Sequence, residues 1–208
     1  MKETMKYNIN KYQLREFALT KILDIIHKQA TTAKHQPLFF GDSLIEGIPS
    51  QYPILNHGIS GMSSEMLEHL LDELVIKFEP SHVFLHIGIN DLATTTLASP
   101  RDIAWNIVRI MLILNQCLPN TKLYVISTLP CIDELSSFKQ TGKGIRCNDM
   151  VNVLNEEIQE HIVHTQAKFI DLNSKLYNDD KSLKQVYYRD GMHLNDEGYH
   201  YLAQYFTQ

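Results

Sequence analysis

Residues 38–47 read LFFGDSLIEG, in which three apolar residues run directly into a glycine, an aspartate and a serine. A short, wholly apolar run is typical of a buried strand in a parallel sheet. Glycine, aspartate and serine favour tight turns and helix starts. The stretch therefore predicts a buried strand that ends in a sharp turn. Ser43 is then either a turn residue or a nucleophile held at the end of that strand.

Four more short apolar runs follow, and helical patterns separate most of them. The runs are PILNHG at 53–58, HVFLHIG at 82–88, KLYVIST at 122–128 and KFIDL at 168–172. Strands that alternate with helices form right-handed βαβ units around a parallel sheet. The sequence thus predicts an α/β protein with three layers, α/β/α.

The intervening segments carry helix signals of two kinds. One apolar stripe runs from Met66 to Leu74, which predicts a helix there. The motif SPRD at 99–102 offers Ser99 as the cap and Pro100 as the first helical residue, and Asn195 is the expected cap of the last helix.

Two regions are expected in the chain. Residues 1–36 have a helical pattern that ends in a polar stretch with a proline, and we expect a helical extension packed on the flank of a domain at 37–208. Contact between two copies is the alternative role for this helix, so a homodimer stays open.

Composition restricts the class of protein. The 208 residues are 44% hydrophobic and 21% charged, enough for a core that needs no disulfide or metal. A net charge of −5 without a basic cluster argues against a nucleic-acid partner. Three widely spaced cysteines favour a reducing cytoplasm, and we expect a cytoplasmic protein without a signal peptide or transmembrane segment.

Polar or glycine-rich motifs follow the strands, at the edge where open parallel sheets bind their ligands. Ser43 follows the first strand, Gly61 the second, Asn90 the third, and Asp190 with His193 the last. Each motif alone also fits a turn, a helix cap or a loop-closing side chain. Together on one edge they favour a catalytic site.

The residue types match acyl transfer. A serine needs a base such as a neutral imidazole, and the imidazole needs a carboxylate to orient it. The N–H groups of Ser43 and Gly61 and the amide of Asn90 could stabilise an oxyanion. Asp190 and His193 lack a third ligand at a recognised spacing, so no metal is expected.

Four motifs occur in order: GDSL at 41–44, NHGISG at 56–61, GIND at 88–91 and DGMH at 190–193. With them the chain resembles the SGNH hydrolases, also called the GDSL esterase/lipase family, over residues 37–206. Within this family, the sequence is most similar to bacterial proteins that resemble platelet-activating-factor acetylhydrolases. The resemblance implies a flavodoxin-like five-stranded parallel sheet in the order 2-1-3-4-5 and a mechanism without metal or cofactor.

The resemblance also implies roles for individual residues. Ser43, Asp190 and His193 would form the catalytic triad, and Ser43, Gly61 and Asn90 the oxyanion hole. Three further residues beside these motifs are expected to bind substrate, namely Asp42, His57 and Asp91, although Asp42 also suits a structural hydrogen-bonding role. His86, in the third run, is expected to be a satisfied core or rim residue.

The expected activity is hydrolysis of a small-molecule carboxylic ester with a short acyl or acetyl group, including lysophospholipid-like esters. A carbohydrate O-acetylesterase or a thioesterase would use the same residues, and a non-catalytic binding module is the alternative from another class.

The segment 129–148 is expected to overhang the site as a lid or specificity wall. His161 and His164 have metal-compatible spacing but fit a solvated helix face.

Overall fold

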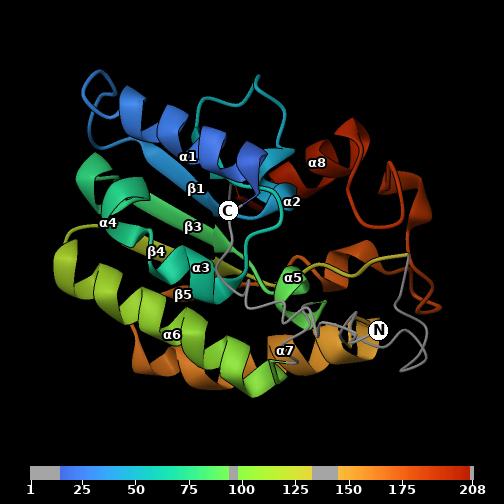
Figure 1. Ribbon diagram of the computed structural model, residues 1–208. Helices are drawn as coiled ribbons and strands as arrows, with labels where there is room; N and C mark the ends of the chain where they lie inside the picture. The colour runs from blue at the N-terminus through green and yellow to red at the C-terminus, as the bar shows by residue number, and fades with distance from the viewer. Residues whose placement is uncertain (1–14, 94–97, 133–144, 207–208) are drawn as a thin grey trace, which may run out of the picture.

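A computed structural model of the chain describes residues 15–93, 98–132 and 145–206. Its centre is a parallel sheet of five strands in the order β2-β1-β3-β4-β5, which confirms the predicted topology (Figure 1). Four of the strands are shorter than the runs that predicted them, whereas the first strand extends one residue beyond the LFF run on each side. They span Pro37–Gly41 (β1), Leu55–Gly58 (β2), His82–His86 (β3), Lys122–Ile126 (β4) and Lys168–Ile170 (β5).

The register of the first three strands determines where the site forms. Gly41, at the end of β1, pairs with Gly58 on one side and with His86 on the other. All three strands therefore end at the same level. The loops that follow them, which carry the GDSL, glycine and GIND motifs, start from one edge of the sheet.

The described residues form eight α-helices and several short 3₁₀ helices. The α-helices are Glu16–Lys28 (α1), Ser43–Glu46 (α2), Ser64–Glu68 (α3), Leu71–Leu74 (α4), Ile89–Leu92 (α5), Pro100–Cys117 (α6), Asn148–His161 (α7) and Asp196–Ala203 (α8). The 3₁₀ helices are Ile76–Phe78 (η2), Ile162–His164 (η3), Ser174–Leu176 (η4), Gln185–Tyr187 (η5) and Gln204–Phe206 (η6).

Two predicted helices differ from the structure. The apolar stripe over 66–74 forms two short helices, α3 and α4, because the backbone leaves helical geometry at Leu70 (φ −108°, ψ 4°). The N-terminal pattern forms a helix over residues 16–28 only, and residues 1–14 lie outside the described ranges.

The predicted helix caps are present. Ser99 accepts a hydrogen bond from the N–H of Asp102, and the Asp102 carboxylate accepts from Ser99 in return, which closes a capping box at the start of α6. Asn195 caps α8 by accepting from the N–H of Gly198 at 2.9 Å. These contacts satisfy N–H groups that a helix itself leaves unpaired.

Each face of the sheet has its own hydrophobic core. Leu38 and Phe40 of β1 pack with residues of α1, α3, α4, α6 and α7, and α6 and α7 lie side by side (Figure 1). Phe39, which points to the opposite face, packs with residues of α2 and α8. In the described part of the chain, every helix is too short or too polar to traverse a lipid bilayer.

Candidate active site

Ser43 begins helix α2, directly after strand β1. The preceding residue, Asp42, has extended backbone geometry, and its Oδ1 accepts a hydrogen bond from the N–H of Leu44 at 2.9 Å. Asp42 therefore caps a helix of only one turn. This cap turns the chain sharply at the end of the strand and places Ser43 as the first helical residue.

Ser43, His193 and Asp190 form a continuous chain of hydrogen bonds. His193 Nε2 lies 2.9 Å from Ser43 Oγ, and His193 Nδ1 lies 3.0 Å from Asp190 Oδ2 and 3.1 Å from Oδ1. A carboxylate only accepts, so Nδ1 carries the proton and Nε2 is free to accept from the serine hydroxyl. A serine in this arrangement could act as a nucleophile, with the imidazole as its oriented base.

The loop around Asp190 keeps its carboxylate ionised. Partial burial opposes the charge, but the backbone N–H groups of His193 and Met192 donate to Oδ1 at 2.7 and 2.8 Å, and the imidazole adds a further hydrogen bond. Together these donors lower the pKa of Asp190 well below its usual range. Asp190 is therefore ionised at neutral pH, as a residue that stabilises an imidazolium must be.

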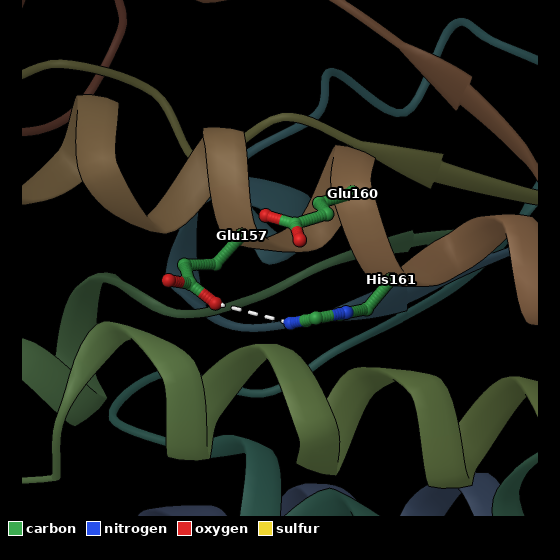
Figure 2. Close-up of side chains that lie close together, drawn as sticks. All are labelled: Glu157, Glu160 and His161. Carbon is green, nitrogen blue, oxygen red and sulfur yellow. Dashed lines mark hydrogen bonds and ion pairs between the residues drawn. The ribbon is translucent and has the colours of Figure 1, made fainter.

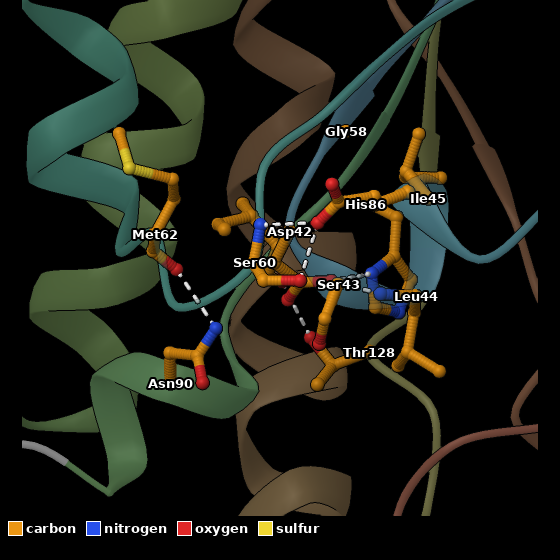
Figure 3. A network of polar contacts seen from close by, with 12 residues as sticks. Asp42, Ser43, Leu44, Ile45, Gly58, Ser60, Met62, His86, Asn90 and Thr128 are labelled. Atoms are coloured by element: carbon orange, nitrogen blue, oxygen red, sulfur yellow. Dashed lines mark hydrogen bonds and ion pairs between the residues drawn. The ribbon is translucent and has the colours of Figure 1, made fainter. Parts of the chain in front are cut away.

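The three groups expected to form an oxyanion hole come from segments that start at the same edge of the sheet. The N–H of Ser43 is one that the helix leaves unpaired, because Ser43 is in the first turn. Gly61 has φ +80°, a left-handed conformation that favours glycine. The Asn90 amide donates to the carbonyl of Met62 at 3.0 Å, which ties it to the loop that carries Gly61 (Figure 3). An amide nitrogen has two hydrogens, so one remains for a ligand.

Asp91 has a structural position, contrary to the expectation that it binds substrate. Its side chain is 3% exposed and accepts from the N–H of Ser64 at 3.0 Å and from the Ser64 hydroxyl at 2.6 Å. Asn106 of α6 donates to the same hydroxyl at 3.0 Å. Asp91 thus fastens α5 to the start of α3, close to the Gly61 loop.

Burial raises the pKa of Asp91 from 3.8 to about 7, although the hydrogen bonds from Ser64 oppose this shift. The folded protein therefore binds a proton more tightly than the unfolded chain, so this contribution to stability is present below about pH 4 and is lost as the pH rises towards 7. The Asp91→Asn variant, measured by urea unfolding between pH 4 and 8, should lose this pH dependence. The change in the free energy of unfolding of the wild-type protein over this range amounts to about 1.4 kcal/mol for each unit of pKa shift. Parallel stability curves for the two proteins would contradict the assignment.

His57 and Asp42 are buried, contrary to the expectation that they contact the substrate. His57 is 5% exposed, its Nδ1 lies 2.6 Å from the carbonyl oxygen of Leu74, and its ring meets Phe78 edge-on at 4.5 Å. Burial lowers the pKa of His57 to about 4, which keeps the ring neutral at physiological pH. Asp42 is fully buried as the cap of α2. Neither side chain opens onto the edge where Ser43 lies.

Sequence reasoning missed several residues that hold the nucleophile turn. Glu46 of α2 accepts from the N–H of Ser60 at 2.8 Å and from the Ser60 hydroxyl, which links the helix of Ser43 to the loop of Gly61. Asn56 donates to the carbonyl of Ile45 at 2.8 Å. Such contacts join residues more than ten positions apart, so no periodic pattern in the sequence indicates them.

An apolar cavity of about 330 Å³ lies on the sheet face that α2 and α8 cover. Leu44, His86 and Tyr199 are among its lining residues, whereas Ser43, Asp190 and His193 are not. The Tyr199 hydroxyl, at its wall, donates to the carbonyl of Leu44 at 2.8 Å. This cavity is therefore behind the nucleophile turn and separate from the side of Ser43 that meets His193.

Glu157, Glu160 and His161 gather at the end of α7, with ligand atoms within 4.8 Å of one another (Figure 2). Both oxygens of Glu157 are already used, because Arg101 contacts them at 3.0 and 3.2 Å and His161 Nε2 lies 3.2 Å from one of them. The His161 ring also stacks on Trp105 at 4.8 Å. The cluster is an ion-pair network between α6 and α7, and the guanidinium already supplies the charge that a cation would bring.

Most of the segment predicted to form a lid, 129–148, falls on residues 133–144, outside the described ranges. Its described end lies beside the site. The N–H of Ile145 donates to the carbonyl of Leu92 at 2.6 Å, and Arg146 Nη1 lies 3.8 Å from the sulfur of Met192, next to His193. The first contact connects this segment to helix α5, which carries Asn90, and the second connects it to the loop that carries His193.

A five-stranded flavodoxin-like sheet with a serine, a histidine and a carboxylate at one edge defines a class of hydrolytic α/β proteins. The sequence matches the GDSL-like lipase/acylhydrolase family over residues 39–201, and the chain belongs to this family. It is thus assigned to a family of enzymes that hydrolyse ester bonds.

Solved structures share the whole fold. A Streptococcus pneumonia protein named for platelet activating factor has a TM-score of 0.79 and 24% identity, with 92% of this chain and 91% of that chain covered. A GDSL-like lipase from Bacteroides thetaiotaomicron has a TM-score of 0.74 and 20% identity, with 93% and 97% covered. An acetyl xylan esterase has a TM-score of 0.62 and 20% identity, with 82% and 97% covered.

One curated protein is also similar in sequence. The N-acylneuraminate cytidylyltransferase of Escherichia coli O18:K1:H7 is 29% identical over 146 residues, which are 69% of this chain. The match covers 32% of that protein, so this chain corresponds to about a third of it.

Proposed function

We propose that this protein hydrolyses carboxylic esters with short acyl groups and that the reaction passes through an acyl-enzyme on Ser43. The observation that carries the proposal is the hydrogen-bonded chain from Ser43 Oγ through His193 to Asp190. Membership of an acylhydrolase family supports the same reaction class.

In this mechanism His193 takes the proton from Ser43 as Oγ attacks the ester carbonyl. Negative charge then develops on the carbonyl oxygen, where the N–H groups of Ser43 and Gly61 and the Asn90 amide would donate to it. His193 protonates the departing alcohol. Water then attacks the acyl-enzyme with His193 again as the base, which releases the acid and restores the Ser43 hydroxyl.

The exposure of the site favours small or polar substrates. The side chain of His193 is 28% exposed and that of Asp190 is 45% exposed. The apolar cavity behind α2 is not lined by any of the three reacting residues. The described structure thus shows no deep apolar cavity lined by the reacting residues that would hold a long hydrocarbon chain.

Hydrolysis of p-nitrophenyl esters with acyl chains from two to eight carbons tests the proposal. We expect kcat/KM to be highest for the shortest chains and to fall as the chain lengthens. Labelling of the wild-type protein by a fluorophosphonate, located at Ser43 by mass spectrometry, would identify the nucleophile independently of the ester chosen. A folded protein that neither hydrolyses these esters nor becomes labelled would contradict the proposal.

Removal of acetyl groups from carbohydrates is the second candidate, and two similarities favour it. An acetyl xylan esterase shares the fold, and part of a protein named for an N-acylneuraminate is similar in sequence. Acetate release from acetylated xylan and from acetylated monosaccharides, measured beside p-nitrophenyl acetate, separates the two candidates. Strict preference for acetyl, with higher kcat/KM on the sugars, would favour the deacetylase.

Asn90→Ala tests the oxyanion role. Loss of one donor to the developing charge should lower kcat about 10²–10³-fold with little change in KM, because the donor matters most in the transition state. The amide also holds the Met62 carbonyl, so Asn90→Asp, which keeps the shape of the side chain, is measured in parallel. A change confined to KM in both variants would assign Asn90 to substrate positioning instead.

A further inference from the structure

A second histidine–carboxylate pair lies behind the nucleophile turn and has no part in the mechanism above. His86 ends strand β3 and Asp42 precedes Ser43, and the two residues are 1% and 0% exposed. His86 Nδ1 lies 3.4 Å from Asp42 Oδ1, and both side chains are drawn in Figure 3. The strand ends approach closely here, since a Cβ at Gly41 would lie 2.1 Å from the carbonyl oxygen of His86.

Apart from the N–H of Leu44, which donates to Asp42 Oδ1, few polar groups in the described part of the chain reach this pair. Among the described residues, neither Asp42 Oδ2 nor the ring nitrogens of His86 have a hydrogen bond of good geometry. His86 borders the apolar cavity together with Leu44 and Tyr199. A buried carboxylate in such surroundings is strongly disfavoured unless a cationic or hydrogen-bonding group compensates it. The imidazole of His86 is in position to do so.

The location of Asp42 connects this pair to the reaction. Asp42 Oδ1 caps α2 through the N–H of Leu44, and so determines the orientation of Ser43. The N–H of Ser43, one residue away, is a proposed oxyanion donor. An uncompensated carboxylate at Asp42 would therefore repel the negative charge that develops in the transition state, and a shifted cap would move Ser43 relative to His193.

We propose that His86 is a positioning residue for the reaction, which holds and compensates the Asp42 carboxylate that caps the nucleophile helix. This inference rests on the proposed ester hydrolysis at Ser43. His86 acts only through Asp42 and touches neither the substrate nor the reacting atoms. Its removal should therefore affect the chemical step and leave substrate binding nearly unchanged.

A double-mutant cycle on these two positions tests the inference. His86→Leu should lower kcat about tenfold or more, with KM within about twofold of wild type. Asp42→Asn removes the charge but keeps a good helix cap. In the Asp42→Asn background, His86→Leu should lower kcat by less than about threefold, because no carboxylate is left to compensate. His86→Gln, which keeps an N–H donor, should lose less activity than His86→Leu.

If His86 only filled space, His86→Leu would lower kcat by the same factor in the wild-type and Asp42→Asn backgrounds. That result would overturn the inference. So would a wild-type kcat in a folded His86→Leu protein. His82→Leu is the matched control, since His82 begins the same strand at the end far from the site, and it should keep wild-type kcat. If His86→Leu does not fold, His86→Gln is compared with and without Asp42→Asn, and equal losses overturn the inference.

The same cycle is measured on the rate of fluorophosphonate labelling of Ser43, which does not depend on the ester chosen. Slower labelling of His86→Leu that Asp42→Asn relieves would support the inference. If the wild-type protein is labelled but the effects of His86→Leu and Asp42→Asn on the labelling rate are independent, the inference alone is overturned. A wild-type protein whose Ser43 is not labelled overturns the proposed function and the inference together.

Discussion

Ser43→Ala is expected to lower kcat for a short-chain ester about 10⁴-fold or more, because it removes the atom that attacks the carbonyl. The fold should persist. Among the described residues, Ser43 contributes its hydroxyl only to the contact with His193, while the cap by Asp42 and the bond from Tyr199 to Leu44 remain. Circular dichroism and thermal unfolding would check this point, and fluorophosphonate labelling should disappear together with the activity.

Ser182→Ala provides the control for this variant. Ser182 is exposed, and its hydroxyl bonds to Asp180 in a surface turn remote in sequence from Ser43. We expect wild-type kcat and full labelling. A well-folded Ser43→Ala protein that kept more than a few per cent of the activity would exclude Ser43 as the nucleophile. The family-wide chemistry would then have to proceed through another residue of this chain.

His193→Gln should lower kcat by a similar factor, about 10⁴-fold or more, because no other side chain contacts Ser43 Oγ as a base among the described residues. Glutamine can keep hydrogen bonds to both partners but cannot accept and return a proton. KM should change little, since the ring acts on the reacting serine. Single-turnover kinetics would locate the loss in acylation as well as in release of the acyl group.

His200→Gln is the matched control, as His200 lies exposed on α8 and takes no part in the site. It should keep wild-type kcat. Asp190→Asn separates orientation from proton transfer, because it retains a side chain of the same shape without the charge. If His193→Gln and His200→Gln had the same kcat, the proposed base would be wrong.

Much of the fold could be predicted because its signals are local. The apolar runs that became β1 to β5 and the capping residues Ser99 and Asn195 each indicate structure within a few positions of the chain. The break between α3 and α4 could not be predicted, since the apolar spacing continues through Leu70 while the backbone leaves the helix there. Periodicity reports which residues face the core, not whether one helix carries them all.

The site residues were likewise predictable only in part. Motifs at the ends of parallel strands identified Ser43, Gly61, Asn90, Asp190 and His193 as candidates, because the topology of such a sheet brings those ends to one edge. The burial of His57 and Asp91 was not evident, although both stand next to these motifs. Neighbours in sequence on an extended segment or a short helix point in different directions, and only the packing decides which one reaches the surface.

The sequence by itself thus determined the succession of strands and helices and the set of chemically suitable side chains, while the order of the strands in the sheet was implied by the family resemblance. The tertiary structure decided which of them meet, because those contacts join residues far apart in the chain: Ser43 with His193 across 150 positions, and Glu46 with Ser60 across 14. It also decided that Asp42 and His86 face each other in an apolar environment. Local patterns follow from backbone preference and periodicity, whereas burial and charge compensation depend on what the rest of the chain brings to the same place.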